Sequence, residues 1–85
     1  MNGETLLKHA AEIVASRRTL YGDPMPLMEA LAKRWSLTLG TQVSAAQVVL
    51  CLIDLKLVRL AHDPEQLDSI VDIAGYAAVL REVTR

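Results

Sequence analysis

Apolar residues recur along the chain at helical spacing, and turn-forming residues divide them into four segments. Over residues 4–17 they follow a 3.6-residue period, which predicts an amphipathic helix that ends near Arg17-Arg18. A glycine and two prolines over residues 21–26 interrupt that period. A second helix is predicted over residues 26–39, and Gly40 closes it as a capping residue.

The third segment is apolar on nearly every side. It opens with Ser44, a good helix N-cap, and runs over residues 44–61. A helix of this composition is buried on most sides, and we expect Cys51 within it to be a small buried hydrophobe. The fourth segment, residues 64–83, opens at Asp63-Pro64, with aspartate as the N-cap and proline at the first helical position.

The pattern predicts an all-α fold. No segment alternates apolar and polar residues over a useful length, so strands are not expected. The four helices are expected to form a single domain over residues 1–85. With a hydrophobic fraction of 52%, the chain carries more apolar surface than so small a monomer can bury. We therefore expect an oligomeric helical bundle, a homo-oligomer such as a dimer or tetramer.

Charge and cysteine content exclude several classes of function. Nine basic against ten acidic residues give a net charge of −1, which argues against a duplex-DNA binder that relies on bulk electrostatics. A single cysteine excludes an internal disulfide, and no Cys and His residues have zinc-ligand spacing. Neither a membrane-spanning run nor a signal peptide is recognisable, so we expect no membrane association and a cytoplasmic location.

Two aspartates of the fourth segment, Asp68 and Asp72, lie one helical turn apart. Their Cβ atoms are then roughly 6 Å apart, which lets both carboxylates share a hydrated Mg²⁺ with phosphate oxygens. Asp54 in the third segment is a candidate third acid. The alternative is structural: the aspartates form a solvated helix face, or they pair with Lys56 and Arg59 across two antiparallel helices.

Cations and aromatic rings supply candidate contacts to a phosphate-bearing ligand. Lys56 and Arg59 stand about 60° apart on the third helix, where arginine offers phosphate a planar fork and lysine a point charge. Tyr76 either stacks on a base or fills the core with its hydroxyl at the edge. Arg18 and Tyr21 form a polar rim beside the first helix, or simply a helix end followed by a turn. No catalytic residue is identified, and whether the protein is an enzyme stays open.

Four motifs, in this order, resemble a small all-α family of tailed phages and prophages whose function is largely unknown. The motifs are Arg18-x-x-Tyr21-Gly22-Asp23-Pro24, then Trp35-Ser36 with Leu39-Gly40, then Leu55 to Leu60, then Asp68-x-x-x-Asp72-Ile-Ala-Gly75-Tyr76. More distantly, the chain is similar to the MazG-like all-α NTP pyrophosphatases. The resemblance implies an obligate helical oligomer whose sites combine helices of more than one subunit.

For the MazG-like enzymes the resemblance implies Mg²⁺-dependent cleavage of a nucleoside triphosphate to the monophosphate and pyrophosphate. Their metal signature is a Glu-x-x-Glu pair on one helix and a Glu-x-x-Asp pair on the next. Only the last acid maps onto this chain, at Asp72, while Ser69 stands where the preceding glutamate would be. The third segment offers Asp54 and no acidic pair. The metal motif is thus degenerate, and such a member is expected to bind nucleotides whether or not it hydrolyses them.

Three hypotheses for the function follow. The first is a nucleotide-binding phage protein, with a Mg²⁺-dependent pyrophosphatase as its catalytic form. The second is a non-catalytic oligomer that sequesters a nucleotide or a cyclic oligonucleotide signal. The third is a protein-interaction module without a small-molecule site, in which the charges of the last two helices form a structural network.

Overall fold

The computed structural model describes all 85 residues, and it consists of four α-helices without strands. α1 spans Gly3–Tyr21, α2 spans Met25–Leu39, α3 spans Ala45–His62 and α4 spans Leu67–Thr84. The all-α fold class and the four helical segments expected from the sequence are confirmed. No helix combines the length and the hydropathy that crossing a membrane requires.

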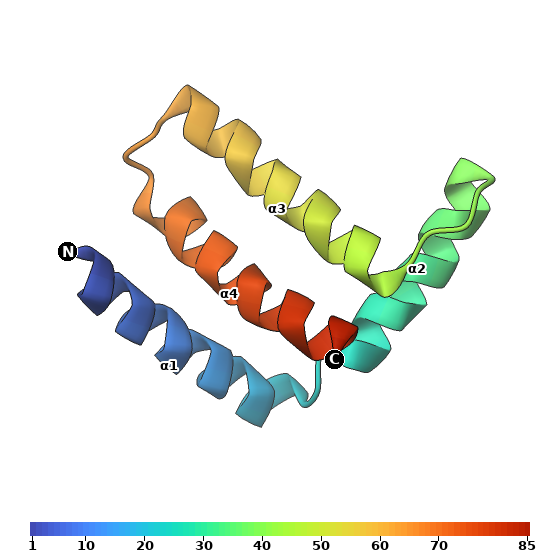
Figure 1. Cartoon of the computed structure of the whole chain (residues 1–85), viewed down its shortest axis with the longest axis horizontal. Helices are drawn as coiled ribbons and strands as arrows, with labels where there is room; N and C mark the ends of the chain where they lie inside the picture. Colours follow the sequence, from blue (N-terminus) through green and yellow to red (C-terminus); the bar gives the residue numbers. More distant parts are fainter.

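α4 lies between α1 and α3 in one layer, and α2 crosses one end of that layer (Figure 1). α1 runs parallel to α4 and packs on no other helix, whereas α3 runs antiparallel to α4. α2 packs on α3 and on α4. α4 is therefore the one helix in contact with all three others.

The core is small and lies where α2, α3 and α4 meet. Met28 and Ala32 of α2 pack against Val48 and Val49 of α3, and half-buried residues near the end of α4 close the cluster. Trp35 packs against the same cluster. Only seven side chains in the whole chain are buried, so one isolated chain has modest hydrophobic stabilisation.

Local sequence signals set several of the helix ends. Asn2 caps α1 by accepting a hydrogen bond from the Thr5 N–H at 2.8 Å. Ser44 and Gln47 form a reciprocal capping box at the start of α3. Gly40, with φ +67°, ends α2 in the left-handed conformation that glycine adopts without strain. The roles predicted for Ser44 and Gly40 are thus confirmed.

The predicted end of the first helix is wrong. α1 does not end near Arg17-Arg18 but continues for about another turn to Tyr21. The stop signal is Gly22, whose φ of +79° takes the backbone out of the helical region. Basic residues are favoured near a helix C-terminus, but they do not by themselves end the helix.

The predicted start of the fourth helix is also wrong. α4 begins at Leu67, and Asp63 is the C-cap of α3 instead of the N-cap of α4. The Asp63 carboxylate accepts a hydrogen bond from the Glu65 N–H at 3.1 Å, which closes a turn between the two helices. Aspartate before proline favours turns as well as helix starts, and here the turn prevails.

α3 is not buried on most sides, which corrects the expectation from its composition. Val48 and Val49 are fully buried on one side of the helix. Four large apolar residues elsewhere on α3 are exposed: Leu50, Leu55, Leu57 and Val58. Cys51 is exposed too, so the prediction of a buried hydrophobe is wrong for the single chain. Packing within one chain therefore leaves much of the apolar surface of α3 uncovered.

Candidate functional site

The contact between α3 and α4 brings together one cation and one acid that the sequence singled out. The Lys56 ammonium lies 2.9 Å from an Asp72 carboxylate oxygen. The Lys56 side chain is 12% exposed and the Asp72 side chain 36% exposed, so the lysine is the more deeply buried partner. The antiparallel helices thus join these two charges, as the structural alternative expected. Each charge neutralises the other, so the pair needs no ligand to explain it.

The other charges predicted near this contact form no ion pair. Arg59, one turn beyond Lys56, and Asp68, one turn before Asp72, are both exposed and unpaired. Asp54 is exposed, and at 100° per residue it lies nearly opposite Lys56, the residue of α3 that reaches Asp72 of α4. No three His, Cys, Asp or Glu side chains are grouped as metal ligands would be. The metal roles of these three aspartates stay predictions, and the three do not form one group of metal ligands within the chain.

The side of α4 that carries Asp72 faces the neighbouring helices. Tyr76, one turn further along, is half-buried and packs against the core cluster, so core packing accounts for its ring. Its role as a ligand contact stays a prediction. Gly75 lies against α1, where an added Cβ would stand 3.9 Å from Val14 Cγ2. The side of α4 that carries Asp72 therefore also serves contacts between helices.

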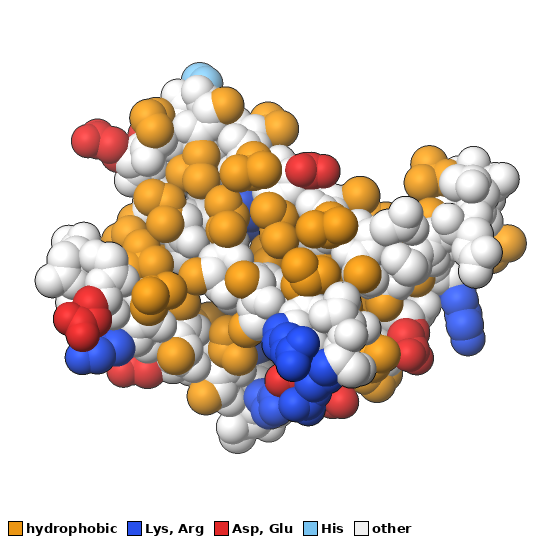
Figure 2. Space-filling model, in the orientation of Figure 1, with side chains coloured by type: hydrophobic (Ala, Val, Ile, Leu, Met, Phe, Trp, Pro, Cys, Tyr) orange, Lys and Arg blue, Asp and Glu red, His pale blue; other side chains and the backbone are white.

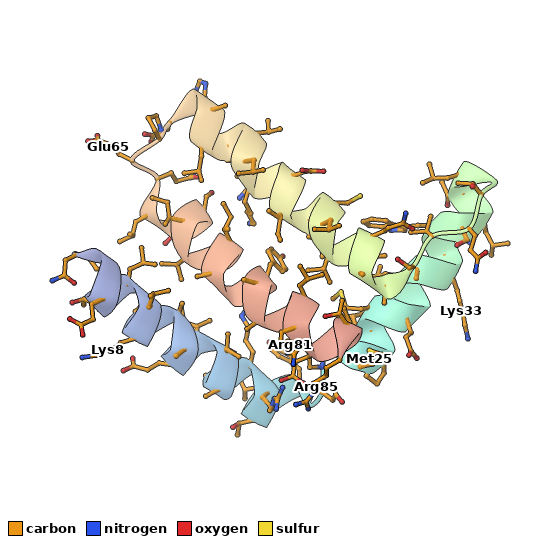
Figure 3. The ribbon with its side chains drawn as sticks, in the orientation of Figure 1. Lys8, Met25, Lys33, Glu65, Arg81 and Arg85 are labelled. Carbon is orange, nitrogen blue, oxygen red and sulfur yellow. The ribbon has the colours of Figure 1, made fainter.

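A cluster of arginines lies at the end of α4, where it meets the last turns of α1. The Glu82 carboxylate lies 3.2 Å from Arg18 of α1 and 3.0 Å from Arg85. Arg81, which precedes Glu82, is exposed and forms no ion pair. Figure 2 shows basic side chains gathered around an acidic one at this corner, and Figure 3 labels Arg81 and Arg85 there. Tyr21, three residues after Arg18, is 79% exposed.

We call Arg18, Arg81, Arg85 and Glu82 the arginine cluster. Its side chains carry a formal charge of +2, in a chain whose net charge is −1. The C-terminal ends of helices favour cations, which gives these arginines a structural reason to gather here. Each guanidinium has five N–H donors, however, and a single shared glutamate occupies few of them. The cluster therefore keeps donors free for an anion.

Sequence reasoning identified only Arg18 of this cluster. Its partner Glu82 is 64 positions away in the chain, and only the packing of α1 on α4 brings the two together. The one local signal was the spacing of Arg81 and Arg85, four residues apart and so on one side of the last helical turn.

A groove of about 430 Å³ runs between α1 and α4 and includes part of the cluster. Its lining is mainly alanine with Leu7 and Val14, and its polar members are Arg18 and Glu82. An apolar groove with a guanidinium at its edge suits an organic phosphate better than a bare ion. A larger hollow of about 800 Å³ lies beside α2 and the loop that follows it, but none of the predicted site residues lines it.

Comparison with known proteins gives this chain a family. A family model described as a domain of unknown function, DUF6378, matches residues 5–84. The chain belongs to the DUF6378 family. This DUF6378 chain is also 33% identical, over 81 residues, to the Gene 55 protein of Mycobacterium phage L5. The match covers 93% of this chain and 52% of that protein, so the chain spans about half the length of its curated relative.

These matches confirm the expected likeness to a phage protein family of unknown function. The more distant similarity to the MazG-like pyrophosphatases is shown by neither match and stays a prediction. No solved structure matches the chain.

Proposed function

We propose that this DUF6378 protein is phage-encoded and binds a nucleotide or another phosphate-bearing small molecule at the arginine cluster. The observation that carries the proposal is the position of Arg18 and Arg85 around Glu82, with Arg81 unpaired beside them, next to the α1–α4 groove. Arginine binds phosphate through two parallel N–H donors, and these side chains have donors to spare.

Two residues that the sequence marked as ligand contacts belong to this corner. Arg18 supplies a guanidinium, and Tyr21 supplies an exposed ring on which a base can stack. Lys56 lies instead at the α3–α4 contact, about 15 Å away along α4 when measured from Asp72 to Glu82, and Arg59 is exposed one turn further along α3. Lys56 is already neutralised there. The support for a ligand is therefore stronger where α1 meets the end of α4.

In its simplest form the proposed function is binding without catalysis, that is, sequestration of a nucleotide or a cyclic oligonucleotide. The Mg²⁺-dependent pyrophosphatase is the catalytic form of the same proposal. No three acids of one chain are grouped as metal ligands, so in that form Mg²⁺ would be held by one or two carboxylates together with phosphate oxygens, or with carboxylates from a second subunit.

The test is a thermal-unfolding panel with inorganic phosphate, pyrophosphate, nucleoside triphosphates and cyclic dinucleotides, each with Mg²⁺ and with EDTA. A ligand at 100 times its Kd raises the free energy of unfolding by about 2.7 kcal/mol. A shift that persists in EDTA supports sequestration, whereas a shift that requires Mg²⁺ supports the metal-dependent form. No shift with any ligand would contradict the proposal.

A matched pair of variants ties the binding to the cluster. Arg81→Ala removes the unpaired guanidinium and should weaken binding about tenfold or more. Arg34→Ala removes an exposed arginine from α2, outside the cluster, and should leave binding unchanged. Equal effects of the two substitutions would place the ligand elsewhere.

A second candidate function, the protein-interaction module, is favoured by a different observation. Twelve large hydrophobic residues are exposed, including four on α3, and this exceeds the scattered exposure that is normal for a monomer. Such a module and a phosphate site are compatible, since the exposed apolar residues of α3 and the arginine cluster lie on different helices.

A further inference from the structure

The chain has a larger accessible surface than is expected for a folded monomer of its mass. Its accessible surface is 6101 Å². A monomeric protein of 9.3 kDa is expected to expose about 5,000 Å². The excess of about 1,100 Å² exceeds the roughly 800 Å² that each partner contributes to a standard interface. The excess accessible surface is thus large enough for one stable interface. Its apolar part includes the uncovered side of α3.

A regular stripe runs along this uncovered side. Cys51, Leu55, Val58 and His62 follow one another at intervals of four, three and four residues, the spacing of the seam positions in a coiled coil. At 100° per residue the four fall within about 60° of arc, nearly opposite the buried Val49. The buried Val48, one helical turn before Cys51, lies in nearly the same direction as Leu55, so the uncovered stripe begins after the first turn of α3. Leu55 is 49% exposed and Val58 is 69% exposed. The stripe has the form of a helix–helix seam that lacks its second helix.

Two unpaired charges border this stripe on opposite edges. Asp54 lies on one edge and Arg59, five residues later, lies on the other. In two parallel helices in register, an edge residue of one helix meets the opposite edge of its partner five residues further along. Asp54 of each copy then meets Arg59 of the other, which gives two equivalent ion pairs. In two antiparallel helices, the edge that carries Asp54 meets the same edge of the partner, and so does the edge that carries Arg59. Neither residue then meets an opposite charge.

We propose that a second copy of this chain covers the stripe, with the two α3 helices parallel and in register about a two-fold axis. The stripe is self-complementary in charge, as the symmetry of such a dimer requires. The arrangement buries Leu55 and Val58 against their equivalents. It also sets Cys51 opposite Cys51 of the second copy, within the reach of a disulfide bond.

Because Cys51 is the single cysteine, the native sequence tests this arrangement directly. The full chain is first examined by sedimentation at 1 to 100 µM, where we expect a dimer. A mild thiol oxidant should then link most chains into a covalent dimer that dithiothreitol reverses. Cys51→Ser should still dimerise but should not be linked. A chain that stays monomeric, or a dimer in which Cys51 does not link, would overturn the proposal.

Charge exchange tests the parallel register independently. Asp54→Arg and Arg59→Asp should each weaken dimerisation about tenfold, because each replaces two attractions with two repulsions. Combining both substitutions in one chain exchanges the charges and should restore the dimer. Glu12→Arg, on the side of α1 away from α4, is the matched control and should leave dimerisation unchanged.

All of the substituted positions are exposed, and circular dichroism checks that the variants remain helical. A combined variant as weak as the single ones would overturn the register. Ligand binding at the arginine cluster is measured in a separate experiment. A chain that does not dimerise would therefore overturn this inference without deciding the proposed function.

Discussion

α3 and α4 are each 18 residues long and similarly rich in apolar residues, yet they are covered very differently. α4 is packed by α1, α2 and α3. α3 is packed by α4 and α2 only, and large apolar side chains elsewhere on it face solvent, as the hydrophobic atoms over this part of Figure 2 illustrate. The apolar content of a helix therefore predicts that the helix is buried, but it does not predict whether the same chain or a partner chain buries it.

The largest expected effect compares a buried with an exposed position of α3, using one type of side chain. Val48 is fully buried and Val58 is 69% exposed. Val48→Ala should lower the free energy of unfolding by about 2 kcal/mol, because it leaves a cavity in the core. Val58→Ala should change it by less than about 0.5 kcal/mol in dilute protein. Urea unfolding measures both values, and equal losses would break the comparison.

The next effect concerns the charge pair between the two helices. Asp72→Asn should lower the free energy of unfolding by about 1–2 kcal/mol, because it leaves the nearly buried Lys56 ammonium without its counter-charge. Lys56→Met should cost less, because the better exposed Asp72 can be hydrated while the methionine keeps the apolar contacts of the lysine chain. A larger loss for Lys56→Met in urea unfolding would contradict the deeper burial of Lys56 in the pair.

A smaller effect, of opposite sign, tests the packing of α1 on α4. Gly75→Ala should raise the free energy of unfolding by up to about 1 kcal/mol, because alanine favours the helix and the new methyl group meets Val14 at ordinary contact distance. A rise in Tm measures the gain. A fall in Tm would mean that α1 lies closer to α4 than this structure has it.

The smallest effect belongs to the exposed ion pair at the end of the same two helices. The Arg18 side chain is 51% exposed, so Arg18→Ala should cost less than about 1 kcal/mol at low salt and almost nothing at high salt. Unfolding at two salt concentrations measures this difference. A large loss that salt does not reduce would indicate a structural role beyond the ion pair.

The parts of the fold that depend on local sequence could be predicted. Gly40 and the capping box at Ser44 act within a few residues of themselves, and both were identified. Lys56 and Asp72 were also predictable, because antiparallel neighbouring helices bring them together. Asp63 was misassigned because the same residues favour a turn and a helix start, and only the surrounding structure decides between them.

The candidate site was less predictable because it depends on contacts between distant segments. Nothing in the sequence near Arg18 indicates that Glu82 lies beside it. The exposure of Cys51 is not predictable for a related reason: apolar neighbours in the sequence do not show whether the same chain or another one covers the side chain. The Arg18–Glu82 contact and the exposure of Cys51 both depend on how the helices pack. The periodicity of a single helix carries no information on that packing.

The attachment of α1 to α4 alone has a consequence for motion and for binding. The α2–α3–α4 core cluster contains no residue of α1, so α1 can open at a lower free energy than the whole fold requires. Its amide hydrogens should therefore exchange with solvent faster than those around Val48. The contact between Arg18 and Glu82 exists only while α1 is docked. A ligand that needs this contact would hold α1 docked on α4. The measured affinity for that ligand would then include the free energy of docking α1.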